Sequence, residues 1–266
     1  MSARPAVLVI AGSDSSGGAG IVRDLSVLSD LGCTALCAIT AVTAQTHERV
    51  VSVHHVPPAV VRSQIRAALE SISVGAIKIG MLGTAATVSA VAESLPSSGN
   101  IPIVLDPVLL SSSGGVLLDA AGREEMRARL FPRAALLTPN LPEAASLCGA
   151  APAADRDACV AQARSLLATG PRAVLLKAGH AEGPAAEDLL LTAEGAPQWL
   201  VSPRVAASRR GTGCTLASAI AAGLASGLSL EAACRSAKRY VLAMLSAEAP
   251  EPGATRDPRH FGNPSL

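Results

Sequence analysis

The hydrophobic positions of this chain form short unbroken runs, separated by longer segments in which apolar residues recur with a helical period. Five runs are rich in Val, Ile, Leu and Ala and show no alternation with polar residues, which is typical of strands buried on both faces. These predicted strands are Ala6–Ile10, Ile77–Leu82, Ile103–Asp106, Ala135–Thr138 and Ala173–Lys177.

The periodic segments between the runs predict helices. Ala59–Ile72 has the clearest pattern, because Val61 and Ile65 share one face and Arg62 and Arg66 lie off it. Further helices are predicted at Thr84–Leu95, Leu118–Leu130, Asp155–Leu167, Cys214–Leu224 and Leu230–Ser246. Strands that alternate with helices over this length indicate an α/β fold with a mostly parallel sheet covered on both sides.

Two segments depart from this alternation. Thr34–Thr43 and Arg49–His55 read as two strands joined by a polar turn, and Asp188–Thr192 and Gln198–Ser202 flank a Glu-Gly-Ala-Pro turn typical of a hairpin. We expect both pairs to be antiparallel additions at an edge of the sheet.

Composition narrows the class of protein. The chain has 266 residues, of which 49% are hydrophobic and 16% charged, so it can bury a sizeable core and is not disordered. We find no linker and expect a single domain over residues 1–250, with an extended or poorly ordered tail over 251–266 that is rich in Pro, Gly and charge. A net charge of +1 and few aromatic residues argue against nucleic-acid binding.

The sequence also bears on the compartment. No apolar run reaches the length of a membrane span, and the first apolar run leads into a Gly-rich loop rather than a signal cleavage site. The six cysteines form no CxxC pair, which predicts free thiols in a reducing cytoplasm. We therefore expect a cytoplasmic protein with no membrane partner.

Two glycine-rich loops are candidate ligand sites. Gly12–Gly20 follows the first strand and opens a helix, but it has neither the Lys-Ser/Thr of a Walker A loop nor a GxGxxG fingerprint, so ligand contact and tight packing both remain open. Arg210–Thr215 opens the Cys214 helix, where Gly-x-Gly amides form a nest for an anion. We expect Cys214, in the first turn, to have a lowered thiol pKa and to be able to act as a base; a plain cap and a packing cysteine are the alternatives.

Polar residues follow other strands at the same predicted edge of the sheet. Asn140 and Glu143 are three apart at a helix start, so they could face one Mg²⁺ or water, or simply form a capping box. Lys177 ends an apolar strand and would be costly to bury unpaired, so we expect it to meet a phosphate or a carboxylate. Asp106 follows another strand directly.

Taken together, these segments resemble the ribokinase superfamily, and within it the hydroxymethylpyrimidine/phosphomethylpyrimidine kinases of thiamine biosynthesis. The resemblance covers Val7 to about Ala247 and rests on an ordered set of stretches: AGSDSSGGAGI, ITAVTAQT, KIGML, VLDPV, LLTPNLPEA, LLKAGH and GTGCTLASA. It implies a three-layer ribokinase-like fold with a central, mostly parallel sheet of about eight strands, and assembly as a homodimer.

The resemblance also implies roles for particular residues. The pyrimidine pocket would be formed, beside Gly12 of the first loop, by Asp24, Gln45, Met81 and Val108. The anion hole and candidate catalytic base would be Gly211, Thr212, Gly213 and Cys214. Mg²⁺ or its waters would be held by Asp106, Asn140 and Glu143, and the nucleotide by Lys177, Asn140 and Thr212.

The activity implied is ATP- and Mg²⁺-dependent phosphorylation of 4-amino-5-hydroxymethyl-2-methylpyrimidine, and then of the monophosphate to the diphosphate. A pyridoxal kinase on the same scaffold is the nearest alternative, and a non-catalytic nucleotide- or pyrimidine-binding module is another. Ser15 and Arg210 depart from the residues usual in the family, where Pro and His often occupy these positions. These departures bear on the substrate more than on phosphorylation itself.

Overall fold

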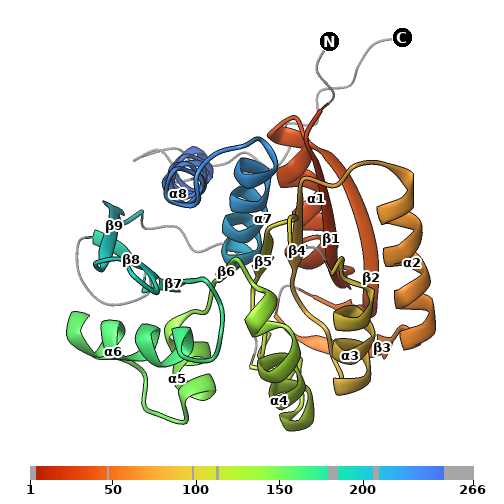
Figure 1. Ribbon diagram of the computed structural model, residues 1–266, viewed down its shortest axis with the longest axis horizontal. Coiled ribbons are helices and arrows are strands. Elements are labelled where there is room, and N and C mark those ends of the chain that lie inside the picture. The colour runs from red at the N-terminus through yellow and green to blue at the C-terminus, as the bar shows by residue number, and fades with distance from the viewer. Residues whose placement is uncertain are drawn as a thin grey trace.

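A nine-stranded sheet forms the centre of the molecule (Figure 1). The computed structural model describes residues 4–46, 48–97, 99–111, 114–178, 185–205 and 210–248. The strands are β1 (Ala6–Asp14), β2 (Thr34–Gln45), β3 (Val50–His55), β4 (Ala76–Ile79), β5 (Ile103–Leu105), β6 (Leu136–Leu137), β7 (Ala173–Lys177), β8 (Ala185–Thr192) and β9 (Gln198–Pro203). Their order is β3-β2-β1-β4-β5-β6-β7-β8-β9.

Six of the nine strands continue one parallel sheet, and the remaining strands close its two edges. β2, β1, β4, β5, β6 and β7 pair in parallel, whereas β3 pairs antiparallel with β2, and β8 and β9 form an antiparallel extension beyond β7. The predicted antiparallel addition is thus confirmed for β8 and β9, but of the other pair only β3 is antiparallel, because β2 pairs in parallel with β1. The sheet has nine strands, one more than the number of about eight that the resemblance implies.

Helices cover both faces of the sheet (Figure 1). One hydrophobic core lies between the sheet and α2 (Pro58–Ser71), α3 (Ala85–Ser94), α4 (Ala120–Arg129), α5 (Leu141–Cys148) and α6 (Arg156–Leu167). The other lies between the sheet and α1 (Gly20–Asp30), α7 (Thr212–Ala225) and α8 (Leu230–Glu248). This is the three-layer arrangement predicted from the sequence.

The predicted elements agree with the structure to within a few residues, with one informative difference. β1 continues four residues beyond the predicted strand, through Gly12 and Ser13 to Asp14. It does so because Ser13 and Asp14 still pair with β2, after an irregularity in the register. Residues 12–14 of the first glycine-rich loop therefore belong to β1, and Asp14, the last residue of β1, pairs with Thr43 of β2.

Other predictions have simpler outcomes. All six cysteines carry free thiols, as expected. None of the helices in the described ranges is long and apolar enough to span a bilayer. The tail at 251–266 lies outside the described residues, and the domain boundary and the homodimer stay predictions.

Candidate active site

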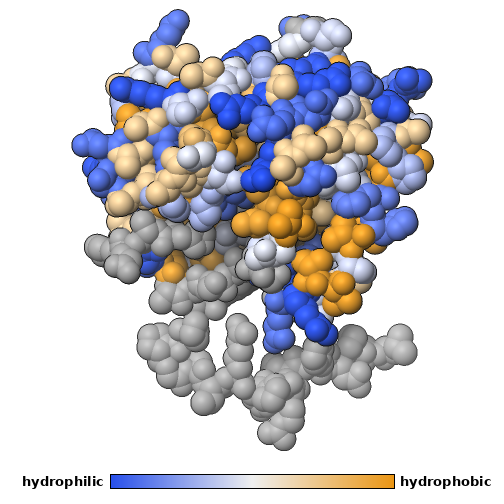
Figure 2. All heavy atoms as spheres, turned by 90° about the horizontal axis from the view of Figure 1, so that it is seen from below, coloured by the Kyte–Doolittle hydropathy of each residue, from blue (hydrophilic) through white to orange (hydrophobic). Residues whose placement is uncertain are grey.

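One large pocket lies at the carboxyl ends of the parallel strands, where open α/β sheets bind ligands. Its volume is about 850 Å³. Twelve of the thirteen residues singled out in the sequence line it: Gly12, Gln45, Met81, Asp106, Val108, Asn140, Glu143, Lys177, Gly211, Thr212, Gly213 and Cys214. Asp24 does not. Apolar side chains gather near the middle of the face shown in Figure 2, with polar side chains around them.

The start of α7 lines this pocket, and the first amides of a helix have no hydrogen-bond partner within the helix. Gly211 is its N-cap, with φ of 77°, in the left-handed region that favours glycine. A Cβ at Gly211 would collide with the carbonyl oxygen of Gly18, so the two glycine-rich loops touch backbone to backbone. The first loop therefore both packs and lines the pocket, and neither alternative for it excludes the other.

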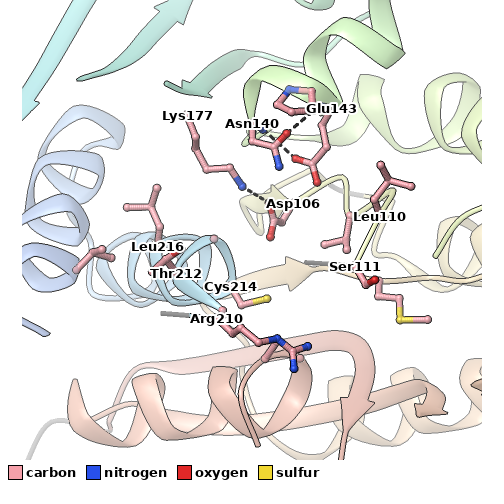
Figure 3. A pocket seen from close by; sticks show the side chains of 18 of the residues that line it. Asp106, Leu110, Ser111, Asn140, Glu143, Lys177, Arg210, Thr212, Cys214 and Leu216 are labelled. Atoms are coloured by element: carbon pink, nitrogen blue, oxygen red, sulfur yellow. Dashed lines mark hydrogen bonds and ion pairs between the residues drawn. The ribbon is translucent and has the colours of Figure 1, made fainter. Parts of the chain in front are cut away.

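Lys177 meets a carboxylate, one of the two partners expected for it. Its Nζ lies 2.7 Å from Oδ1 of Asp106, which also accepts from the hydroxyl of Thr138 at 3.0 Å (Figure 3). Burial would raise the pKa of Asp106, but the charges of Lys177 and Lys78 outweigh it and lower that pKa. The pair is thus ionised, and it places a fixed cation beside Gly213.

Asn140 and Glu143 form the capping box that the sequence left open. Asn140 Oδ1 accepts from the Glu143 amide at 2.8 Å, and Glu143 Oε2 accepts from the Asn140 amide at 2.8 Å (Figure 3). Both residues also line the pocket. Burial raises the pKa of Glu143 to about 7, and the nearby Asp106 charge adds to the rise, although Lys177 opposes it.

The prediction of a lowered thiol pKa at Cys214 is wrong. Burial among the surrounding protein atoms raises the pKa of Cys214 to about 11. Lys78 and the backbone of Gly20 lower it, but Asp24 and Asp106 add to the rise. The start of a helix therefore does not by itself activate this thiol, which is protonated near neutral pH.

The placement of Asp24 in the pyrimidine pocket is also wrong. Its side chain is fully buried beneath the pocket, where Oδ2 lies 2.7 Å from Nζ of Lys78 and Oδ1 accepts from Ser218 at 2.8 Å. The reason is Lys78 itself, a buried ammonium that needs a counter-charge. Sequence reasoning missed Lys78, although a lysine inside the otherwise apolar strand β4 is a signal that could have found it.

At the end of the pocket away from Lys177, hydrogen bonds hold the backbone of Gln45 in place. The hydroxyl of Ser15 bonds both backbone groups of Gln45, at 2.9 Å to its nitrogen and 3.0 Å to its oxygen. A Cβ at Gly12 would lie 2.9 Å from the sulfur of Met81, so a glycine gives that side chain its room. Asp14 lines the same end and was not predicted.

The pocket thus joins the glycine-rich start of α7 and a paired lysine to a second compartment with apolar and amide groups. A sheet covered by helices on both faces, with such a pocket at the carboxyl ends of its parallel strands, defines a phosphotransferase, a kinase of the ribokinase-like type.

The chain belongs to the phosphomethylpyrimidine kinase family, whose model matches residues 14–260. It is 44% identical to a hydroxymethylpyrimidine/phosphomethylpyrimidine kinase of Streptomyces coelicolor, over 92% of this chain and 90% of that one.

Solved structures agree. A phosphomethylpyrimidine kinase of Clostridium difficile has a TM-score of 0.79 and 35% identity, covering 91% of this chain and 100% of that one. A pyridoxal kinase of Staphylococcus aureus, in complex with AMP-PCP and pyridoxal, has a TM-score of 0.82 and 32% identity, covering 91% and 87%.

Proposed function

We propose that this enzyme uses ATP and Mg²⁺ to phosphorylate 4-amino-5-hydroxymethyl-2-methylpyrimidine, and then the resulting monophosphate to the diphosphate. The observation that carries the proposal is the continuity of the pocket, in which the Gly211–Cys214 amides share one cavity with Gln45, Met81 and Val108. Donor phosphate and acceptor hydroxyl can therefore meet without crossing a wall. Holding them in line removes much of the entropic barrier, about 7–11 kcal/mol in favourable cases.

The phosphate end acts through position and charge. Phosphoryl transfer passes through a loose transition state, so neutralising the charge on the moving group matters more than proton removal. The amides of Gly213 and Cys214 point from the positive end of the α7 dipole, and Lys177 lies 3.1 Å from where a Gly213 side chain would begin. These groups would hold the γ-phosphoryl, with Thr212 and Asn140 beside the nucleotide.

The residues present fit Mg²⁺ that is held largely by phosphates and water. Asp106 and Glu143 both line the pocket, and no cluster of three or more metal-ligating side chains occurs in the described part of the chain. Mg²⁺ commonly takes one or two protein carboxylates and completes its shell with waters and substrate phosphates. When bound, it would offset charge on the phosphates, and Glu143 would serve it through Oε1 or a water.

The acceptor end positions the pyrimidine. Met81 and Val108 offer apolar faces to the ring, and the Gln45 amide offers a donor and an acceptor to its edge. Cys214 lines the same pocket, and because burial raises its pKa to about 11, only a small fraction of the thiol is ionised near neutral pH; only that thiolate fraction could take the hydroxyl proton. Its contribution is therefore expected to be smaller than that of Lys177 and the amides.

We also propose that the enzyme acts in the cytoplasm, which its six free thiols support, and that it is a homodimer, as the resemblance of its sequence implies.

The test is a coupled ADP-release assay with the hydroxymethylpyrimidine, its monophosphate and pyridoxal as separate acceptors. We expect turnover with both pyrimidines and little with pyridoxal. Lys177→Ala should abolish most of this turnover, whereas Arg235→Ala, which removes an exposed surface ion pair with Glu231, should retain it. Turnover of pyridoxal alone would make the enzyme a pyridoxal kinase, and ligand binding without ADP release would make it a binding module.

A further inference from the structure

The acceptor end of the pocket contains a carboxylate that the proposed function does not use. Asp14 lines the pocket, and only 4% of the residue is exposed. Its Oδ1 accepts from the backbone amide of Ser16 at 2.8 Å and from the Ser16 hydroxyl at 2.7 Å. Its Oδ2 is buried and accepts no hydrogen bond from any residue in the described ranges. A buried carboxylate oxygen without a donor is costly, which indicates that a ligand supplies one.

Arg210 keeps this carboxylate charged without satisfying it. Its Nη2 lies 3.8 Å from Asp14 Oδ2, an ion-pair distance too long for a hydrogen bond. Its Nη1 donates instead to the carbonyl of Thr46 at 2.7 Å and reaches Ser16 Oγ at 3.5 Å. Burial would raise the pKa of Asp14, but the interactions with Gln45, Ser16 and Arg210 outweigh it and lower that pKa. Asp14 is therefore ionised near neutral pH and can only accept hydrogen bonds.

Gln45 lies beside the charged Asp14 carboxylate, so the two side chains would act on the same ligand group. Asp14 and Gln45 end the adjacent parallel strands β1 and β2, and Ser15 bonds the backbone of Gln45 at both its nitrogen and its oxygen. The Gln45 amide interacts with the Asp14 carboxylate and lowers its pKa, but no N–H group in the described ranges donates a hydrogen bond to Oδ2, so a ligand can bond both to Oδ2 and to the Gln45 amide oxygen. Both groups then present acceptors at this end.

We infer that Asp14 is a specificity-determining residue, which selects acceptor substrates whose ring carries an amino group. The inference rests on the proposed function and deepens it. An aminopyrimidine offers two N–H donors to Asp14 and Gln45. The ring hydroxyl of pyridoxal offers one donor, and none once it ionises, so its oxygen would face the Asp14 carboxylate. This end of the pocket thus favours the pyrimidine over pyridoxal.

The experiment compares two enzymes on three substrates. Wild type and Asp14→Asn are assayed for kcat/KM with the aminopyrimidine and with an analogue that has hydrogen in place of the amino group, and with pyridoxal. Asp14→Asn should lose about 10–100-fold with the aminopyrimidine, mainly in KM, and much less with the deamino analogue. The preference over pyridoxal should shrink by a similar factor. Asp30→Asn, an exposed carboxylate that accepts from Tyr240 away from the pocket, is the matched control.

The outcomes separate this inference from the proposed function. Equal losses with the amino and deamino rings would show that Asp14 only supports the loop, and would overturn the inference. Calorimetry of the wild type without ATP gives a second measurement that needs no variant: equal affinity for the two rings also overturns it. Wild type that turns over neither pyrimidine would instead overturn the proposed function.

Discussion

A methyl group added at Gly213, where the γ-phosphoryl group is proposed to bind, should lower activity without lowering the free energy of unfolding. Gly213 lies in the first turn of α7, and its φ is not among the positive values found for other glycines, so alanine meets no backbone strain there. Its Cβ would lie 3.1 Å from Lys177 Nζ and 3.8 Å from Asp106 Oδ2. The lysine would have to move by a few tenths of an ångström, while alanine stabilises a helix by up to about 1 kcal/mol relative to glycine.

We therefore expect Gly213→Ala to keep its free energy of unfolding within about 1 kcal/mol of wild type, a change of a few degrees in Tm for a chain of this size. Its kcat/KM for ATP should fall roughly 100-fold, the usual effect of losing one preorganised group at a developing charge. Urea unfolding and the ADP-release assay measure the two quantities. Combined with Lys177→Ala, the loss should be less than additive, because both changes act on one contact.

Gly211→Ala is the contrasting variant. Its φ of 77° and the collision with Gly18 should destabilise the fold by several kcal/mol. A folded Gly213→Ala enzyme with activity within threefold of wild type would refute the reasoning, since the amides would then not hold the phosphoryl group.

Three further predictions follow from the charges. Because the Cys214 pKa is about 11, kcat should rise between pH 7 and 10 in the wild type, and this rise should be absent in Cys214→Ala; parallel profiles would remove the thiol from proton transfer. Glu143, with burial raising its pKa to about 7 from 4.5, binds a proton more tightly when folded, so its contribution to stability falls as pH rises from about 4.5 to 7. Glu143→Gln should therefore be more stable than wild type at pH 8, by up to about 2–3 kcal/mol, and not at pH 4.5; equal differences in urea unfolding at both would contradict this. Lys78→Met leaves Asp24 buried and unpaired and should lower the free energy of unfolding by about 3–5 kcal/mol, with Lys78→Met/Asp24→Leu recovering much of it; an unchanged single variant would show that the pair contributes little.

The fold could be predicted because its strands are buried on both faces. A strand such as Ala173–Lys177 has no polar side to interrupt its apolar run, so the run and the strand coincide. The polar residues directly after such strands were found by the same reasoning, since parallel strands end at one edge. Asp106 and Lys177 meet there as expected.

The errors concern contacts between distant parts of the chain. Asp24 and Lys78 are 54 residues apart, and nothing near either one shows that they pair. The pKa of Cys214 depends on burial by elements outside its own helix, which outweighs the local effect of the helix start. Asp14 was missed because β1 runs further than its apolar run, and strand pairing rather than hydrophobicity sets where it ends.

The placement of α7 has a consequence for synthesis of the protein. The sheet face that carries Val7, Val104 and Leu136 is covered by α1, made early, and by α7 and α8, which are made after every strand of the sheet. A growing chain can thus cover its opposite face with α2–α6 in order while this one stays partly bare to water. Nascent chains stopped before residue 210 should bind chaperones through that face, and such a chain lacks the Gly211–Cys214 amides, so ATP turnover can begin only after α7 has been made.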